Sequence, residues 1–213
     1  LSACRNCEQS EFGAFYMDAN GVAIFKSRSQ VLSAAGATPT VFAQDGAGIA
    51  YSSIVFAFDD RQVVNNVSAT RTGGTAQTAS DSDSITKYFT HSLSYTNLIA
   101  ETDTDTLNIA RAYVGSRKDT TIRIDSITLD LNTPSYTTGI SAALTLDYFS
   151  EVTITNTQPA GSTITQTLQV QGIAHSITPS TWFTTLTTEE PILDGFIIGS
   201  SLYGILGTSV LSY

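Results

Sequence analysis

The feature that most constrains the fold of this chain is its content of small hydroxyl side chains, with 32 Thr and 25 Ser among 213 residues. Threonine is β-branched, which makes it a weak helix former and suits it to the pleated surface of a sheet. Hydrophobic residues make up 41% of the chain, which is enough to build a buried core. We therefore expect a folded protein that is richer in strands than in helices.

The charge balance argues against a protein that binds nucleic acid independently of sequence. The chain carries 10 Lys and Arg against 19 Asp and Glu, a formal net charge of −9, whereas such binding needs basic groups to neutralise phosphates. The most apolar stretch, residues 195–211, is interrupted by glycines and predicts turns and short strands rather than a membrane span. With Leu1 in first place and no signal-peptide pattern, we expect the C-terminal part of a longer polypeptide.

Local patterns predict two helices and one tight hairpin. Residues 1–13 have helical spacing and Gly13 is a possible cap. Residues 15–25 predict a hairpin, because Asn20-Gly21 favours the positive φ angles of a tight turn between aromatic and branched residues. A second helix is expected to begin at the N-cap Thr102 and to end near Gly115, Arg117 and Lys118. Its apolar stripe is Leu107, Ala110, Tyr113 and Val114.

Strand-like alternation recurs through the rest of the chain. Residues 33–48 are expected to be a loop, and residues 72–84 an exposed hairpin tip or a flexible loop. A phase slip at Asp125-Ser126 predicts a β-bulge. The expected strands are residues 51–58, 62–71, 85–95, 121–131, 144–157, 162–177 and a last one after Trp182.

Together these elements predict an α+β, β-rich fold of barrel-like antiparallel sheets with one or two helices packed on them. We expect two domains. Residues 1–100 would hold a helix end, a hairpin and a strand-rich segment, and residues 101–213 a helix followed by a barrel-like domain and a tail segment.

Cysteine and histidine are too few for most catalytic or metal-binding constellations. Cys4 and Cys7 have no second pair at zinc-ligand spacing and read as two ordinary thiols on a helix. His91 and His175 are the only histidines, and neither has a recognisable catalytic partner, so both are interpreted as structural. We therefore predict no catalytic, cofactor-binding or metal-binding residues and no cofactor.

Four further motifs have a functional interpretation and a simpler one. Two Asp-x-Asp runs, at residues 81–84 and 103–106, resemble the start of a calcium loop, but they lack its Gly and its bidentate Glu. A solvated loop explains the first and helix capping the second. Adjacent Glu189 and Glu190 would face opposite sides of a strand, so they cannot act together as the carboxylate pair of a glycosidase. Gly73-Gly74 lacks the Lys and the helix of a phosphate loop. Trp182 with Phe183 is a sugar platform or, more simply, an aromatic anchor.

Several segments, taken in order, resemble the C-terminal part of the tail-hub proteins, also called minor tail proteins, of long-tailed bacteriophages. The strongest segment is Val-Gln-Gly-Ile-Ala-His-Ser-Ile-Thr-Pro-Ser-Thr-Trp at 170–182, similar to a family run with Gly-Ile, His, Pro and Trp. At residues 83–88 the chain is similar to a family Asp-Ser-Ile-x-x-Tyr-Gly segment, with Phe89 in place of the usual Gly. The other matching segments are residues 15–25, 64–71, 110–114, 123–130, 151–155, 193–196 and 203–207.

The resemblance implies a structural virion protein at the tail tip or baseplate hub that is not an enzyme. It implies self-association in a ring, expected to be a homotrimer, and binding to other tail proteins, such as those of the tail tube, the distal tail and the fibres. An acidic ring around a DNA conduit would let phosphates pass without holding them. Trp182, nine Tyr and the many Thr leave a carbohydrate- or receptor-binding β-module as an alternative, and a hydrolase using Asp and Glu as a third.

Overall fold

A computed structural model describes residues 2–18, 20–27, 30–31, 38–57, 62–120, 122–133, 136–159 and 161–190. These residues form four helices and eleven strands. The predicted α+β, β-rich class is therefore confirmed. The apolar stretch at residues 195–211 lies outside the described residues. Within the described ranges, none of the helices combines the length and apolar character needed to cross a membrane.

The chain divides into two compact units, and neither is continuous in sequence. Unit 1 comprises residues 1–33, 59–121 and 192–213, and unit 2 comprises residues 34–58 and 122–191. Unit 2 is thus interrupted by a long stretch of unit 1. The division into residues 1–100 and 101–213 stays a prediction.

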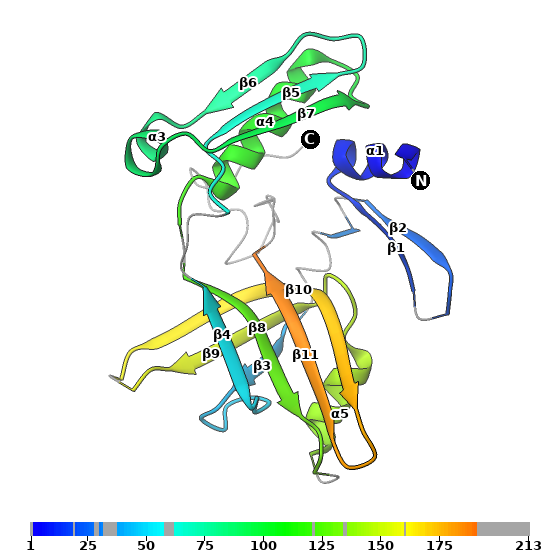
Figure 1. The fold of residues 1–213 in the computed structure, drawn as a ribbon, viewed down its shortest axis with the longest axis vertical. Coiled ribbons are helices and arrows are strands. Elements are labelled where there is room, and N and C mark those ends of the chain that lie inside the picture. Colours follow the sequence, from blue (N-terminus) through cyan, green and yellow to red (C-terminus); the bar gives the residue numbers. More distant parts are fainter. Residues whose placement is uncertain are drawn as a thin grey trace. The chain divides into compact units, whose positions relative to one another are not determined.

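Unit 2 is built on one six-stranded sheet with the order β3-β9-β10-β11-β8-β4 (Figure 1). All neighbours in it run antiparallel except β3 and β9, which are parallel. The two outer strands, β3 and β4, are not paired with each other in the described ladder, so the expected barrel does not close. The strands are β3 (Thr40–Ala43), β4 (Ser53–Ala57), β8 (Arg123–Asp130), β9 (Glu151–Thr157), β10 (Thr163–Ile177) and β11 (Trp182–Glu189).

The predicted bulge in β8 is confirmed. Opposite β4, Val55 pairs with Ser126 while the next residue, Phe56, pairs with Ile124, so Asp125 is the extra residue. The bulge restores the inward phase of the apolar residues on both sides of it, which is why Ile124 and Ile127 are both buried.

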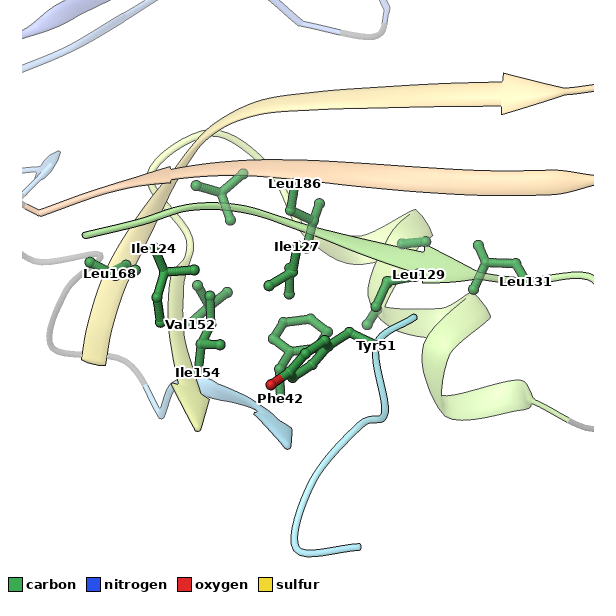
Figure 2. Packing of buried hydrophobic residues seen from close by; sticks show 13 residues of the cluster. Phe42, Tyr51, Ile124, Ile127, Leu129, Leu131, Val152, Ile154, Leu168 and Leu186 are labelled. Atoms are coloured by element: carbon green, nitrogen blue, oxygen red, sulfur yellow. The ribbon is translucent and has the colours of Figure 1, made fainter. Parts of the chain in front are cut away.

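One face of this sheet carries the core of unit 2. Figure 2 shows the rings of Phe42 and Tyr51 among aliphatic side chains from β8, β9, β10 and β11. Helix α5 (Thr137–Thr145) contributes Ala142 and Ala143 to the same cluster. The Tyr51 hydroxyl donates to the carbonyl oxygen of Thr155 at 3.0 Å, so the one polar group of that ring is satisfied.

Unit 1 contains a three-stranded sheet with the order β6-β5-β7 and a helix packed on it (Figure 1). The strands are β5 (Asn66–Arg71), β6 (Gln77–Ser80) and β7 (Ser92–Leu98), and β5 pairs parallel with β7. Helix α4 (Asp103–Arg117) begins at the predicted N-cap Thr102, which forms a reciprocal capping box with Asp105. Its buried face includes Ala110 and Val114, as predicted, and it continues past Gly115 to Arg117.

The N-terminal part of unit 1 confirms the predicted helix and hairpin. Helix α1 (Ser2–Glu11) precedes strands β1 (Ala14–Met17) and β2 (Ala23–Lys26), which pair antiparallel around Gly21 at φ +78°. Gly13 is not the cap, because Phe12 takes the positive φ of 50° at the helix end. A Cβ at Gly13 would instead collide with the carbonyl oxygen of Lys26. Cys4 and Cys7 are both free thiols on α1.

Several local predictions are wrong. Residues 33–48 include β3, a short strand stabilised by parallel pairing with β9 more than 100 residues later. Residues 72–84 hold the tight turn at Gly73 between the antiparallel strands β5 and β6, which confirms the hairpin-tip alternative. They also include β6 and the start of helix α3 (Ser82–Tyr88), which replaces the first half of the strand expected at 85–95. Residues 144 and 145 belong to α5, not to a strand. The six-stranded and three-stranded sheets are mixed rather than purely antiparallel, whereas the β1–β2 pair is antiparallel.

Candidate interaction surface

The outer face of the unit 2 sheet presents a ladder of threonine pairs across β9 and β10. Their Oγ1 atoms lie within hydrogen-bonding distance in three directly opposed pairs: Thr153–Thr167 at 3.2 Å, Thr155–Thr165 at 3.2 Å and Thr157–Thr163 at 3.4 Å. We call these six residues the threonine face. The threonine face arises because successive side chains of a strand point to opposite sides of the sheet. The residues that alternate with the threonines, such as Val152, Ile154 and Leu168, are buried in the core.

The threonine face has no charged side chain, although the chain as a whole is strongly acidic. A fourth pair, Thr128–Thr185 at 3.1 Å, continues the hydroxyl pattern onto β8 and β11. Hydroxyl groups that already pair with one another cost less to cover than charged groups, because fewer bonds to water are lost. Such a face is suited to contact with another protein surface.

Glu151 lies at one end of the threonine face, opposite Gln169 on β10. Its side chain is only 6% exposed, and its Oε2 atom has no hydrogen-bond partner. Burial raises the pKa of the Glu151 carboxyl above its ordinary value of 4.5. Sequence reasoning missed this group, because nothing local distinguishes it from a solvated glutamate at the start of a strand.

Replacing Glu151 with Gln is expected to stabilise unit 2 by about 1–3 kcal/mol at pH 8. A raised pKa in the folded state means that ionisation costs stability as the pH rises above 4.5, and the neutral amide removes that cost. The gain should shrink as the pH falls and should vanish well below 4.5, where the wild-type carboxyl is protonated in both states.

Urea denaturation of both proteins between about pH 5 and pH 8 measures this difference. The control is Glu101→Gln, at an exposed position before α4, which should give no gain. A Glu151→Gln variant that is less stable than the wild type at pH 8 would show that the carboxylate has a stabilising partner.

The two histidines lie in different units, His91 in unit 1 and His175 in unit 2. His91 donates its backbone N–H to Asn65 Oδ1 at 2.8 Å, and its Nε2 lies 3.0 Å from the carbonyl oxygen of Tyr88. His175 Nδ1 lies 2.8 Å from the hydroxyl of Thr184 on the neighbouring strand. Trp182 is partly buried against the core of unit 2 and donates weakly from Nε1 to His175 Nδ1 at 3.5 Å. The described contacts of both histidines are hydrogen bonds to backbone groups or side chains nearby, and their structural role stays a prediction.

The two Asp-x-Asp runs lie at helix N-termini and are tied to basic residues. Asp81 accepts from the Ser84 amide at 2.9 Å and pairs with Lys118 at 3.1 Å, so the first run is a cap of α3 rather than the expected solvated loop. The hydrogen bond from the Ser84 amide is the main cause, and that from Lys118 the second, of a lowered pKa at the Asp81 carboxyl.

In the second run, Asp103 pairs with Arg71 at 2.6 Å and accepts from the Thr75 hydroxyl at 2.7 Å. The hydrogen bonds from Thr75 and Arg71 lower its pKa. No cluster of three or more metal-ligating side chains occurs within the described ranges.

Comparison with known proteins shows a likeness in fold to tail proteins of solved structure. No family model matches the chain, and no curated protein matches it in sequence. Among the solved structures that share its fold are two tail proteins. The 43 kDa tail protein of prophage MuSo2 from Shewanella oneidensis matches with a TM-score of 0.54 and 13% identity over 90% of this chain. The tail protein from Neisseria meningitidis MC58 matches with a TM-score of 0.55 and 11% identity over 88% of this chain.

The chain spans about half the length of both tail proteins, 52% and 53% respectively. At these identities the likeness concerns the fold, which covers both units of the chain. This likeness in fold agrees with the tail-protein resemblance seen in the sequence.

Proposed function

We propose that this chain is a structural, non-catalytic subunit of a bacteriophage tail, located at the tail tip or baseplate hub. The observation that carries the proposal is the fold, shared over 90% and 88% of the chain with two tail proteins. The protein would act by fitting against copies of itself, in a ring expected to be a trimer, and against neighbouring tail proteins.

The surfaces of the described residues support an assembly role. The threonine face offers hydrogen-bonding groups without charges, so a neighbour can cover it at a low desolvation cost. Large apolar side chains are exposed in both units, among them Met17 and Val22 in unit 1 and Val55 and Leu144 in unit 2. A net charge of −9 would keep a ring around a DNA conduit from holding phosphates.

Labelling of purified particles tests the proposal. Antibody-gold or a fused tag on this chain, viewed by electron microscopy of the phage that encodes it, should mark the distal end of the tail. Averaged images should show a closed ring of copies. Label on the capsid, or particles that lack the chain, would contradict a tail role, and a chain that stays monomeric at high concentration would contradict the ring.

A further inference from the structure

Phe89 combines an exposed aromatic ring with a backbone conformation that normally belongs to glycine. It follows the last residue of α3 with φ 63° and ψ −177°, a region that side chains with a Cβ rarely enter. Its side chain is 82% exposed, the largest exposed fraction among the exposed large hydrophobic residues of the described chain. Glycine would fit this position without strain, so the ring itself needs an explanation.

The Phe89 ring makes few stabilising contacts with its own chain that could offset this backbone strain. Phe12 also has a positive φ, of 50°, but its ring lies 6.0 Å from the ring of Tyr113. The strain at Phe12 is thus offset by packing within unit 1. At Phe89 most of the ring is in solvent, where an aromatic group gains nothing from burial. A ring of this kind is typical of a contact made with a partner.

A buried polar network holds the Phe89 backbone in place. Asn65 is fully buried, and its Nδ2 donates to the Phe89 carbonyl oxygen at 2.7 Å and to Ser84 Oγ at 3.1 Å. The Asn65 Oδ1 accepts from the backbone N–H of His91 at 2.8 Å. Because the residues on both sides of the ring are fixed in this way, little backbone freedom is left to lose on binding.

The tip of the β1–β2 hairpin has properties that complement those of Phe89. We define this tip as Met17, Asp18, Asn20, Gly21 and Val22. Met17 is 57% exposed and Val22 56%, and a two-stranded hairpin is marginal in water unless something covers it. Methionine packs favourably against aromatic rings. Asp18 Oδ1 accepts from the amides of Asn20 and Val22, at 2.9 Å and 2.7 Å, so this tip is also held in one shape.

Opposite charges beside Phe89 and on the hairpin tip favour a second copy of this chain as the partner. Copies with a net charge of −9 repel one another except where opposite charges meet. Lys87, two residues before Phe89, is an exposed cation whose Nζ lies 4.7 Å from the centroid of the Tyr88 ring. Asp18 is the one charged residue of the hairpin tip.

We propose that Phe89 is an anchor that docks one copy of this chain onto the hairpin tip of a second copy, with Lys87 facing Asp18. The contact joins two different surfaces, so it repeats head to tail and closes a ring where the rotation allows it. This inference rests on the proposed function, because it supplies a contact between neighbouring subunits.

Photochemical crosslinking tests the contact directly. The variant Phe89→p-benzoylphenylalanine places a benzophenone on the anchor, and this group reacts readily with methionine side chains. Met17 is the single methionine of the chain, so irradiation of the full-length protein should give a dimeric adduct that maps to Met17. A mixture of light and isotopically heavy chains shows whether the adduct joins two copies. The same group at Leu144, which is 67% exposed on α5, is the control and should not label Met17.

Each outcome of this experiment decides the proposal. An adduct between copies at Met17 supports it. Adducts only within one chain, only at other sites of a second copy, or only with another tail protein in assembled particles would overturn it. If particle labelling succeeds while the Met17 adduct is absent, the docking inference fails and the tail function stands. If the adduct forms but particles lack the chain, the tail function fails instead.

Phe89→Gly separates an anchor from a structural residue, because the two roles predict opposite changes in stability. We expect a higher melting temperature, since glycine adopts the backbone angles without strain. We also expect self-association weaker by about thirtyfold in analytical ultracentrifugation, the size of effect typical of an anchor residue. Leu144→Ala should change neither. A Phe89→Gly protein that melts lower, or that associates as tightly as the wild type, would contradict the proposal.

Discussion

Replacing Phe42 with alanine should lower the free energy of unfolding of unit 2 by about 3–5 kcal/mol. Phe42 is completely buried on the short strand β3 and packs beside Tyr51 in the core (Figure 2). Truncating the ring removes its contacts and leaves a cavity that the surrounding strands cannot fill. The loss should be large because β3 has only four residues, and beyond its pairing with β9 the described residues add a single bridge, between Phe42 and Ile49.

The single tryptophan of the chain makes this prediction measurable. Trp182 lies on β11, so urea denaturation followed by its fluorescence reports on unit 2. The matched control is Val41→Ala, one residue earlier on the same strand with a largely exposed side chain, which should cost less than about 1 kcal/mol. Equal losses for the two variants would mean that strand pairing, and not burial of the ring, stabilises β3.

Replacing Asn65 with alanine should destabilise unit 1 by about 3 kcal/mol. The substitution removes the Nδ2 donor to the Phe89 carbonyl and the Ser84 hydroxyl, and the Oδ1 acceptor of the His91 amide. Buried polar groups left without partners cost about 1–3 kcal/mol each, and rearrangement recovers part of that. Ser84 keeps its bond to the Lys118 carbonyl at 2.5 Å.

Hydrogen exchange read by mass spectrometry follows unit 1 without a tryptophan in it. Peptides from α3 and β5 should exchange faster in Asn65→Ala, while those from β9–β11 should not change. Asn66→Ala is the control. Asn66 is the next residue along the chain, and its Nδ2 donates to Ser92 Oγ at 3.1 Å in a solvent-exposed hydrogen bond. Protection unchanged in Asn65→Ala would show that the network is not what holds the Phe89 segment.

The elements that could be predicted are those with a complete local signal. Helix α4 has the capping box of Thr102 and Asp105, and the first hairpin has Asn20-Gly21 between two apolar strands. The bulge at Asp125 was visible because the apolar residues on both sides of it change phase. In each case the residues that determine the structure lie within one turn or one strand of each other.

The elements that were missed depend on partners far away in the chain. Helix α5 has no side-chain N-cap bond at Tyr136 and is supported by burial of its alanines in the unit 2 core. Helix α3 is polar, and its cap Asp81 is bound by Lys118, 37 residues later. Strand β3 needs β9. The sequence pattern of a short segment does not show which distant residues will contact it.

The candidate surfaces were predictable to different degrees. Alternating threonines at 153, 155 and 157 and at 163, 165 and 167 imply a hydroxyl-bearing face once the strands are known. Burial of Glu151 and exposure of Phe89 depend on what covers each side chain, which a strand or helix pattern does not contain. The one signal for Phe89 was its position where the resembling tail proteins have glycine, and the positive φ of 63° gives that difference a physical meaning.

The pairing of β4 with β8 has a consequence for how this architecture can change. Ala57 and Arg123 are direct cross-strand partners, so everything from residue 58 to residue 122 leaves and re-enters the unit 2 sheet at adjacent backbone positions. A segment whose ends meet in this way can be lengthened, exchanged for another module or reduced to a short turn while the hydrogen-bond ladder on either side keeps its register. The sheet therefore offers a natural graft point, at which new attachments can be acquired without redesigning the scaffold that carries them.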